Sequence, residues 1–339
     1  MTGVETMVAS QPLRTQRLRG RGLGASGRVL RLMWQALIVA FGVVVITFLL
    51  VRVVPGDPAT AILGSKGSDA AKDALRKALN LDDPLYLQFF HYIANVARGD
   101  LGESFAGGGR SVLSIVTNSL GVTLPVVAIT MVISTVIAVP LGLLAGLRRG
   151  AADVGIRATM TVLLTLPPFF LGLVLLLVLA LKIPLFPAGG WAGYWPDNFQ
   201  YAILPSLALA GYLVPILTRG TRQAAISASQ QTWMEASYAR GLSPLRLAFA
   251  HVLPNSLLPV ITLLGYNVGV LIAGAVVVEA IFGLPGIGQE LVNAVNQRDY
   301  PVIQGIALAT ALIIIAANLI ADLIVSFADP RGRKSSDRT

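Results

Sequence analysis

Six uninterrupted runs of apolar residues dominate the sequence, and each is long enough to cross a lipid bilayer. A hydrocarbon core of about 30 Å needs roughly 20 apolar residues in a helix that rises about 1.5 Å per residue. The runs are Leu32–Val51, Leu120–Leu147, Ala158–Leu181, Tyr201–Thr218, Ser256–Val278 and Val302–Ala321. Because lipid offers the backbone no hydrogen-bond partners, we expect helices rather than open strands. The sequence therefore predicts an all-α membrane protein with about six transmembrane helices.

The composition agrees with a chain that lies in lipid. Of the 339 residues, 55% are hydrophobic and 13% are charged, whereas about a quarter of the residues in a soluble domain are charged. The net charge of +9 could indicate nucleic-acid binding, but basic residues at the cytoplasmic ends of membrane helices produce the same excess. We therefore predict contact with membrane lipid and no nucleic-acid partner. The chain has no Cys, so it forms no disulfide and offers no thiolate.

Basic residues are distributed asymmetrically between the connections, and this predicts the orientation. Short loops rich in Lys and Arg stay in the cytoplasm. The first apolar run follows a basic arm and is longer than the core of a signal peptide, so we interpret it as a retained anchor with a cytoplasmic N-terminus. Alternation from there places the following residues inside: Arg148, Arg149, Arg157, Arg219, Arg222, Arg240, Arg246, Arg331, Arg333, Lys334 and Arg338. The C-terminus is then also cytoplasmic.

This topology divides the chain into successive parts. They are a basic cytoplasmic N-terminal arm (1–31), the first transmembrane helix (32–54), a long extracytoplasmic loop (55–119), a core of five transmembrane helices (120–328) and a cytoplasmic tail (329–339). Within the loop, Ser68–Leu79 and Pro84–Val96 are predicted to be short amphipathic helices. They could cap the ends of the membrane helices or form a docking surface for an external partner.

A cytoplasmic connection at 219–255, called the coupling segment below, is too long to be a simple link. Ala224–Arg240 contains neither Pro nor Gly and is predicted to be helical. Gly241 suits a helix C-cap, and Ser243 suits an N-cap with Pro244 at the first helical position. The sequence therefore predicts a helix, a turn and a second short helix that project together as a hairpin between two membrane spans.

The coupling segment resembles the cytoplasmic signature of permeases in ATP-binding cassette (ABC) importers. Glu235, Ala236, Gly241, Leu253 and Pro254 stand at the family's spacing. Two neighbouring positions depart from it, because the chain has Ser237 in place of a second Ala and His251 where Ile is common. The resemblance implies that an external ATPase grips a rigid knob here. The residues implied in ATPase coupling are Glu235, Ala236, Gly241, Leu242, Ser243, Pro244, Leu253 and Pro254.

Further motifs resemble the dipeptide/oligopeptide type of these permeases. They are Pro55-Gly56-Asp57-Pro58, Gly99-Asp100-Leu101-Gly102-Glu103-Ser104, Glu279-Ala280-Ile281-Phe282, Pro285-Gly286-Ile287-Gly288, Arg298-Asp299-Tyr300-Pro301, Asn318-Leu319, Asp322 and Asp329-Pro330-Arg331. The resemblance implies a multi-pass subunit of a prokaryotic inner or plasma membrane that moves di- or oligopeptides or similar small solutes. It also implies a second permease, two cytoplasmic nucleotide-binding subunits that hold ATP and Mg, and an extracytoplasmic solute-binding protein.

No pattern in the sequence indicates catalysis by this chain. It lacks the GxxxxGK[ST] phosphate loop, so a separate subunit must supply ATP hydrolysis. Gly22, Gly24 and Gly27 match GxGxxG, but no strand precedes them. The only histidines, His91 and His251, are predicted on opposite sides of the membrane. We therefore predict no enzyme activity and no catalytic, cofactor or metal residues, and the sequence identifies no residues of a substrate path.

Two other functions are compatible with the hydropathy. An ion-gradient-driven secondary transporter would use Asp322 as its proton site, because an ionisable residue inside a membrane span is functional by default. We favour a structural hydrogen bond for Asp322, which lies close to the predicted helix end with Asn318 one turn before it. A membrane anchor or assembly subunit without a translocation path is the third possibility.

Small residues and prolines predict how the spans pack. Gly142 with Gly146, and Gly265 with Gly269, have the spacing that lets two helices approach closely in lipid. Pro removes a backbone donor, so prolines should break or kink the third and fourth spans. The prolines concerned are Pro167, Pro168, Pro205 and Pro215.

Overall fold

The structure is a computed structural model that describes residues 25–53, 68–78, 82–106, 108–148, 150–232, 234 and 241–328. Its helices are α1 (Ala25–Val53), α3 (Asp69–Ala78), α4 (Leu85–Ala97), α5 (Val112–Leu147), α6 (Ala151–Thr165), α7 (Pro168–Leu175), the π-helix η1 (Leu176–Lys182), α8 (Asn198–Ser229), α10 (Pro244–Leu247), the π-helix η2 (Ala248–Val252), α11 (Leu253–Phe282), α12 (Ile287–Gln297) and α13 (Tyr300–Ala328). Across these residues the only β-pairing is an isolated bridge between Glu103 and Ser111. The predicted all-α class is confirmed for this part of the chain.

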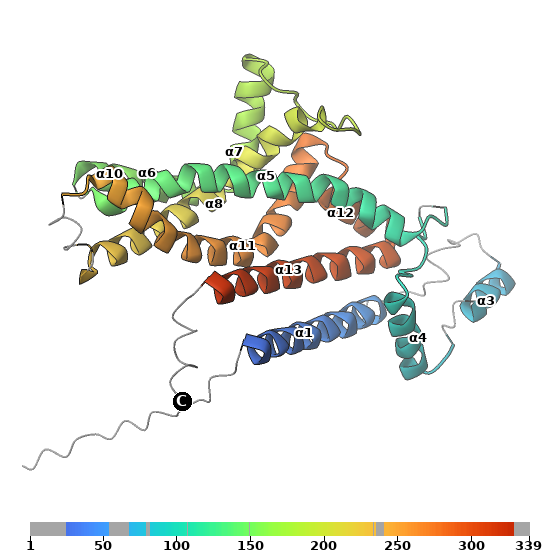
Figure 1. The fold of residues 1–339 in the computed structure, drawn as a ribbon. Coiled ribbons are helices and arrows are strands. Elements are labelled where there is room, and N and C mark those ends of the chain that lie inside the picture. The colour runs from blue at the N-terminus through green and yellow to red at the C-terminus, as the bar shows by residue number, and fades with distance from the viewer. Residues whose placement is uncertain are drawn as a thin grey trace, which may run out of the picture.

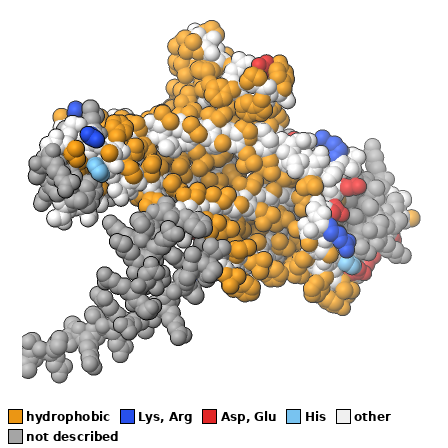
Figure 2. All heavy atoms as spheres, in the orientation of Figure 1, with side chains coloured by type: hydrophobic (Ala, Val, Ile, Leu, Met, Phe, Trp, Pro, Cys, Tyr) orange, Lys and Arg blue, Asp and Glu red, His pale blue; other side chains and the backbone are white. Residues whose placement is uncertain are grey.

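The long helices run between two ends of the molecule (Figure 1). We call these the α10 end, where α8 stops and α6 starts, and the α12 end, near the start of α5. Figure 2 shows hydrophobic side chains over the middle of the visible face and most charged side chains at the two ends. This distribution suits an apolar belt in lipid between two aqueous surfaces.

Five of the six predicted apolar runs fall within single helices, and the run Ala158–Leu181 is divided among α6, α7 and η1. Four described helices are long and apolar enough to cross a membrane, namely Val112–Leu147, Asn198–Ser229, Ala248–Phe282 and Tyr300–Ser326. The pair Ala151–Thr165 and Pro168–Lys182 makes a fifth if it is one span. Within α1, Met33–Leu49 is a shorter apolar helical segment. The total of six crossings stays a prediction.

The third predicted run is not one straight helix. It is divided between α6 and the pair α7–η1, which are bent by 96° at the break before Pro168. Pro167 and Pro168 therefore interrupt this span as predicted, and Figure 1 shows the arm beyond α7 standing away from the long helices. By contrast, α8 is one helix through Pro205 and Pro215. The fourth span is therefore not broken, and a kink at these prolines stays a prediction.

Glycines bring neighbouring helices together, as predicted. A Cβ added at Gly142 would lie 2.6 Å from Cβ of Thr221, and one at Gly146 would lie 2.9 Å from the carbonyl oxygen of Arg222. These close approaches pack α5 against α8. A Cβ at Gly265 would collide with the side chain of Ala321 on α13. A larger residue at these positions would push the helix backbones apart.

The helix α4 packs against α1. The ring of Phe89 lies 5.0 Å from that of Phe48 and 6.2 Å from that of Phe41, in edge-to-face geometry. The hydroxyls of Tyr92 and Thr47 are 3.3 Å apart. Both predicted loop helices are present, as α3 and α4. The contacts of α4 favour its interpretation as a cap on a membrane helix.

A short helix, α12, lies between the last two spans and was not predicted. Its 11 residues are too few to cross a membrane. The buried side chains of Ile287 and Ala294 pack it into a small apolar cluster with the start of α5 and with α13. The helix therefore ties together elements that meet at the α12 end.

Candidate functional site

The turn of the coupling segment lies at the α10 end and has the predicted cap geometry. Gly241 adopts a left-handed conformation with φ of +72°, which glycine adopts without steric cost. The hydroxyl oxygen of Ser243 accepts a hydrogen bond from the backbone N–H of Arg246 at 3.4 Å. Pro244 is the first residue of α10. The predicted N-cap at Ser243 and the first helical position at Pro244 are therefore confirmed, and Gly241 has the left-handed conformation that the predicted C-cap requires.

The helices on either side of this turn differ from the prediction. The helix expected over Ala224–Arg240 ends earlier, because α8 stops at Ser229. Glu235 and Ala236 lie outside the described residues, as do Pro55–Pro58, residues 1–24 and the tail. The second helix is longer than expected, because α10 continues through η2 into α11 without a gap. Leu253 and Pro254 thus occupy the first turn of α11.

Residues 243–252, called the knob below, expose one face and bury the other. Leu247 and Val252 are buried against the long helices. Phe249 points away from this core, with 62% of its surface exposed. A cavity of about 290 Å³ separates the knob from the end of α5 and is lined by Val139, Pro140, Leu143, Leu144, Leu147, Arg148, Met234, Leu247, Ala248, Phe249 and Leu253. The knob therefore combines an anchored base with an exposed aromatic surface.

A fully buried carboxylate holds the α12 end together. Glu279, near the end of α11, has 0% of its surface exposed. Its Oε1 accepts a hydrogen bond of 2.5 Å from the hydroxyl of Thr123 on α5, and its Oε2 accepts one of 2.7 Å from the backbone N–H of Gly288. The hydroxyl oxygen of Thr123 accepts in turn from the N–H of Ile287 at 2.9 Å. Thr123, Glu279, Ile287 and Gly288, called the Glu279 cluster, cap the start of α12 and join it to two spans.

Close packing around the cluster requires glycine at positions 286 and 288. A Cβ at Gly286 would collide with the carboxylate of Glu279, and one at Gly288 would collide with the backbone of Val276. Gly283, at the end of α11, adopts a left-handed conformation with φ of +60°. From the sequence, these residues were identified only as parts of family motifs, and no role was predicted for Glu279. An acidic residue next to an apolar run is the signal that could have found it.

A second carboxylate at the same end joins two motifs that are far apart in the sequence. Asp299 is buried between α12 and α13. It accepts a hydrogen bond of 2.5 Å from the hydroxyl of Ser104 and bonds of 3.1 Å from the N–H groups of Phe105 and Ala106. The motif at 99–104 is thus fixed to the turn at 298–301. The preceding Arg298 has φ of +55°, an uncommon value for a residue with a Cβ.

Two adjoining cavities open beside these carboxylates. One has a volume of about 470 Å³ and is lined by Arg110, Ser114, Ile115, Thr117, Asn118, Ser119, Gly121, Val122, Trp191, Gly193, Trp195, Asn198, Pro285 and Glu290. The other, of about 280 Å³, is lined by Ser104, Ala106, Arg110, Ile115, Glu290, Asn293, Ala294, Gln297, Asp299 and Val302. Arg110, Ile115 and Glu290 line both. We call the pair the α12-end cavity.

An ion pair holds α6 to α8 near the α10 end. The guanidinium of Arg222 forms hydrogen bonds of 2.7 Å and 2.8 Å with the two carboxylate oxygens of Asp153. Arg157 approaches the same carboxylate at 3.3 Å but is more exposed. The two-point contact of Arg222 fixes the relative orientation of the helices.

Asp322 does not have the expected structural role among the described residues. It is half-buried on α13. No hydrogen bond joins its carboxylate to the side chain of Asn318. Oδ1 of Asn318 is buried without a hydrogen-bond partner in this part of the chain. The hydrogen bond favoured from the sequence is therefore absent here.

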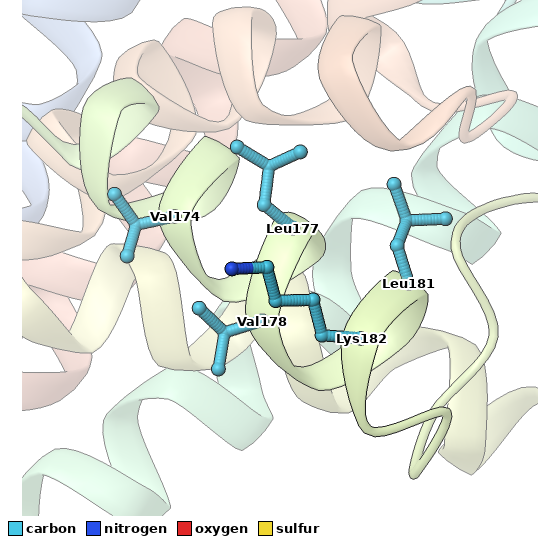
Figure 3. A pocket seen from close by; sticks show the side chains of 5 residues that line it. All are labelled: Val174, Leu177, Val178, Leu181 and Lys182. Atoms are coloured by element: carbon cyan, nitrogen blue, oxygen red, sulfur yellow. The ribbon is translucent and has the colours of Figure 1, made fainter.

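The arm formed by α7 and η1 presents an apolar surface. Figure 3 shows the side chains of Val174, Leu177, Val178, Leu181 and Lys182 around a cavity of about 430 Å³ on this arm. Four of the five side chains are aliphatic, and Lys182 supplies the only charge. Such a surface suits lipid or an apolar protein partner rather than a polar solute.

The sequence matches a known membrane-protein family along most of its length. Residues 138–334 match "Binding-protein-dependent transport system inner membrane component", and residues 28–131 match the N-terminal part of the same kind of component. The chain belongs to this family. The suspected resemblance is thereby confirmed, and the coupling segment lies inside the first match.

The chain covers nearly the full length of several relatives. The oligopeptide transport system permease protein AppB of Bacillus subtilis is 33% identical, over 86% of this chain and 95% of its own. The di/tripeptide transport system permease protein DppB of Pseudomonas aeruginosa is 33% identical, over 86% and 94%. The glutathione transport system permease protein GsiC of Escherichia coli is 34% identical, over 86% and 93%. The chain is thus a permease component of an importer, and its relatives are named for different small solutes.

Proposed function

We propose that this permease and a second, similar permease form the path through which an ATP-driven importer moves peptides or similar small solutes into the cell. Two cytoplasmic nucleotide-binding subunits would hold ATP and Mg, and a solute-binding protein outside would deliver the cargo. The names of the relatives support this class of cargo. The family assignment disfavours an ion-gradient-driven transporter, and no described contact gives Asp322 a proton-relay partner.

The observation that carries the proposal is the continuous helical path from the knob to the Glu279 cluster. The path runs through α10, η2 and α11 from Pro244 to Phe282. At a rise of about 1.5 Å per residue, the 30 residues of α11 alone reach about 45 Å, longer than a hydrocarbon core of about 30 Å. A displacement of the knob would therefore reach the α12 end through one rigid element.

The orientation follows from this assignment together with the positive-inside rule. The α10 end, with Arg148, Arg157, Arg219, Arg222 and Arg246, would face the cytoplasm. The α12 end would face the exterior and meet the solute-binding protein. ATP can drive the switch between outward-open and inward-open states only if the ATPase contacts differ between the two states. The exposed surface of the knob is where those contacts would form.

The apolar arm α7–η1 is the surface that would contact the second permease. It stands away from the rest of the chain and leaves large apolar side chains exposed, among them Phe169, Phe170 and Leu177. In a heteromeric complex these side chains would be buried against a partner within the membrane. Whether the partner is a different chain or a second copy would be answered by the composition of the purified complex.

The test compares two phenylalanines at opposite ends of the molecule. Phe249 on the knob is 62% exposed, and Phe90 on α4 is 64% exposed. Phe249→Ala should leave the thermal unfolding of the chain unchanged but should reduce co-purification of the nucleotide-binding subunit and ATP-dependent uptake in vesicles, because exposed aromatic residues are frequent hot spots at interfaces. Phe90→Ala, the matched control, should change neither.

The same experiment can refute the proposal. Full co-purification and uptake by Phe249→Ala, together with a Gly241→Pro variant that also transports normally, would remove the coupling role from this segment. Uptake that persists without ATP and follows an imposed proton gradient would instead establish the secondary-transporter alternative.

A further inference from the structure

The α12-end cavity has the features of a small-molecule binding site. Its two parts have volumes of about 470 Å³ and 280 Å³, and ligand sites in proteins commonly span about 300–1,000 Å³. The walls come from the start of α5, the start of α12 and the loop before α8. None of these lining residues belongs to the knob, so the cavity is separate from the surface assigned to ATPase coupling.

Three charged residues line the cavity, and the carboxylate of one of them, Asp299, already accepts hydrogen bonds from residues 104–106. The other two are of opposite sign. Arg110 and Glu290 line both parts of the cavity. Neither forms an ion pair with another residue in the described part of the chain. A guanidinium and a carboxylate that share one cavity can each bind a ligand group of the opposite charge. A ligand with a single charge would leave one of them uncompensated.

Polar side chains follow one face of the first turns of α5. Ser114, Thr117 and Asn118 are exposed, and their spacing of three and one positions places them on one side of the helix, followed one turn later by the exposed Gly121. Asn293 and Gln297 add amide groups from α12. These groups can donate to and accept from the peptide units of a ligand. An apolar ligand or a lipid chain would offer these groups no hydrogen bond.

Two tryptophans of the loop before α8 line the cavity, and a buried asparagine holds this loop in place. Asn198 has 2% of its surface exposed, and its Oδ1 accepts from the N–H groups of Ala192 at 2.9 Å and Gly193 at 3.1 Å. These bonds fix the loop that bears Trp191 and Trp195, whose rings meet edge to face at 5.9 Å. A preorganised aromatic surface binds apolar side chains at a low cost in entropy.

We propose that the α12-end cavity binds a zwitterionic, peptide-like solute, with Arg110 contacting its carboxylate, Glu290 contacting its ammonium group and the two tryptophans contacting its side chains. The inference rests on the proposed function, because the cavity would be the external entrance of the import path. It assigns a substrate class to particular residues, which the family membership alone does not do.

The experiment measures peptide binding to the full-length chain in lipid nanodiscs by equilibrium dialysis. The probes are radiolabelled trialanine, its C-terminal amide and its N-acetylated form. Trialanine should bind, and Arg110→Gln should weaken this binding by about tenfold, as expected for the loss of one charge-assisted hydrogen bond. Arg110→Gln should not further weaken binding of the amide, which lacks the carboxylate. Glu290→Gln should weaken binding of trialanine by a similar factor but should leave binding of the N-acetylated form unchanged.

Matched controls use charged residues near the same end that do not line the cavity. Arg98→Gln and Glu103→Gln, both at exposed positions, should bind trialanine as the unmodified chain does. Absence of trialanine binding to the folded chain would overturn the proposal. So would an Arg110→Gln variant that loses affinity equally for trialanine and for its amide, because that result would indicate a general disturbance of the cavity.

The readout separates this inference from the proposed function. Peptide binding is measured on the chain without ATP, and co-purification of the nucleotide-binding subunit is measured in parallel. A cavity that fails to bind trialanine while the subunit still co-purifies overturns only the inference. A cavity that binds trialanine with the expected charge dependence, in a chain that never associates with an ATPase, overturns only the proposed function.

Discussion

The hydroxyl of Thr123 on α5 bridges the carboxylate of Glu279 on α11 and the backbone N–H of Ile287 at the start of α12. It donates to the first at 2.5 Å and accepts from the second at 2.9 Å. One side chain thus joins two membrane spans to the short helix between the last two spans. Since all of these atoms are buried, the groups that remain after its removal would have no water to replace it.

Thr123→Val should therefore destabilise the protein. Valine keeps the branched shape but can neither donate nor accept, so one oxygen of Glu279 and the N–H of Ile287 lose their partner. We expect a cost of about 1–3 kcal/mol in the free energy of unfolding, seen as a lower thermal midpoint in detergent. Thr135→Val is the matched control, because this half-buried hydroxyl bonds only to the carbonyl of Met131 in its own helix. Equal effects of both substitutions would contradict the bridging role.

Gly288→Ala should disturb the same cluster by steric overlap. The added Cβ would collide with the backbone of Val276, which cannot move aside as a flexible side chain could. Overpacking of this kind costs about 1–3 kcal/mol, measured by the same thermal unfolding. Gly155→Ala on α6 has open space around the new Cβ, so it should be neutral or stabilising by up to about 1 kcal/mol. A Gly288→Ala variant as stable as this control would show that the helices separate without cost.

Asp299→Asn should loosen the segment at 104–106. The carboxylate of Asp299 accepts from the hydroxyl of Ser104 and from the N–H groups of Phe105 and Ala106, and an amide offers only one oxygen to these donors. We expect faster hydrogen exchange at Phe105 and Ala106, measured by mass spectrometry. Asp100→Asn provides the comparison, since that exposed side chain accepts only from Gly102. Unchanged exchange in the Asp299 variant would refute this anchoring role.

Two arginines that share one carboxylate should differ in their contributions. Arg222→Gln removes a two-point contact with Asp153 from a side chain that is 24% exposed, whereas Arg157→Gln removes a single contact from one that is 54% exposed. The first should cost about 1–3 kcal/mol, and the second less than about 1 kcal/mol. Double-mutant cycles with Asp153→Asn would measure each coupling. A larger coupling for Arg157 would reverse this assignment.

Particular residues show how far the sequence predicts this fold. The six apolar runs and the glycine spacing at Gly142 and Gly146 are local patterns, and the helices and the close packing of α5 with α8 follow from them. The cap formed by Gly241, Ser243 and Pro244 was also predicted, because its geometry depends on a few adjacent residues. The early end of α8 and the continuation of α10 into α11 were not predicted, since both depend on packing between distant helices.

The sequence by itself determined the membrane class, the helical content, the family and the local turn of the coupling segment, because hydropathy and cap chemistry act over short stretches of chain. Only the tertiary structure decided which polar residues meet. Glu279 forms a hydrogen bond with Thr123, which is 156 positions away in the sequence, and Asp299 forms one with Ser104, which is 195 positions away. A carboxylate buried among apolar helices needs hydrogen-bond donors, and the tertiary fold decides which residues supply them. The periodicity of the sequence does not indicate which distant residues these are.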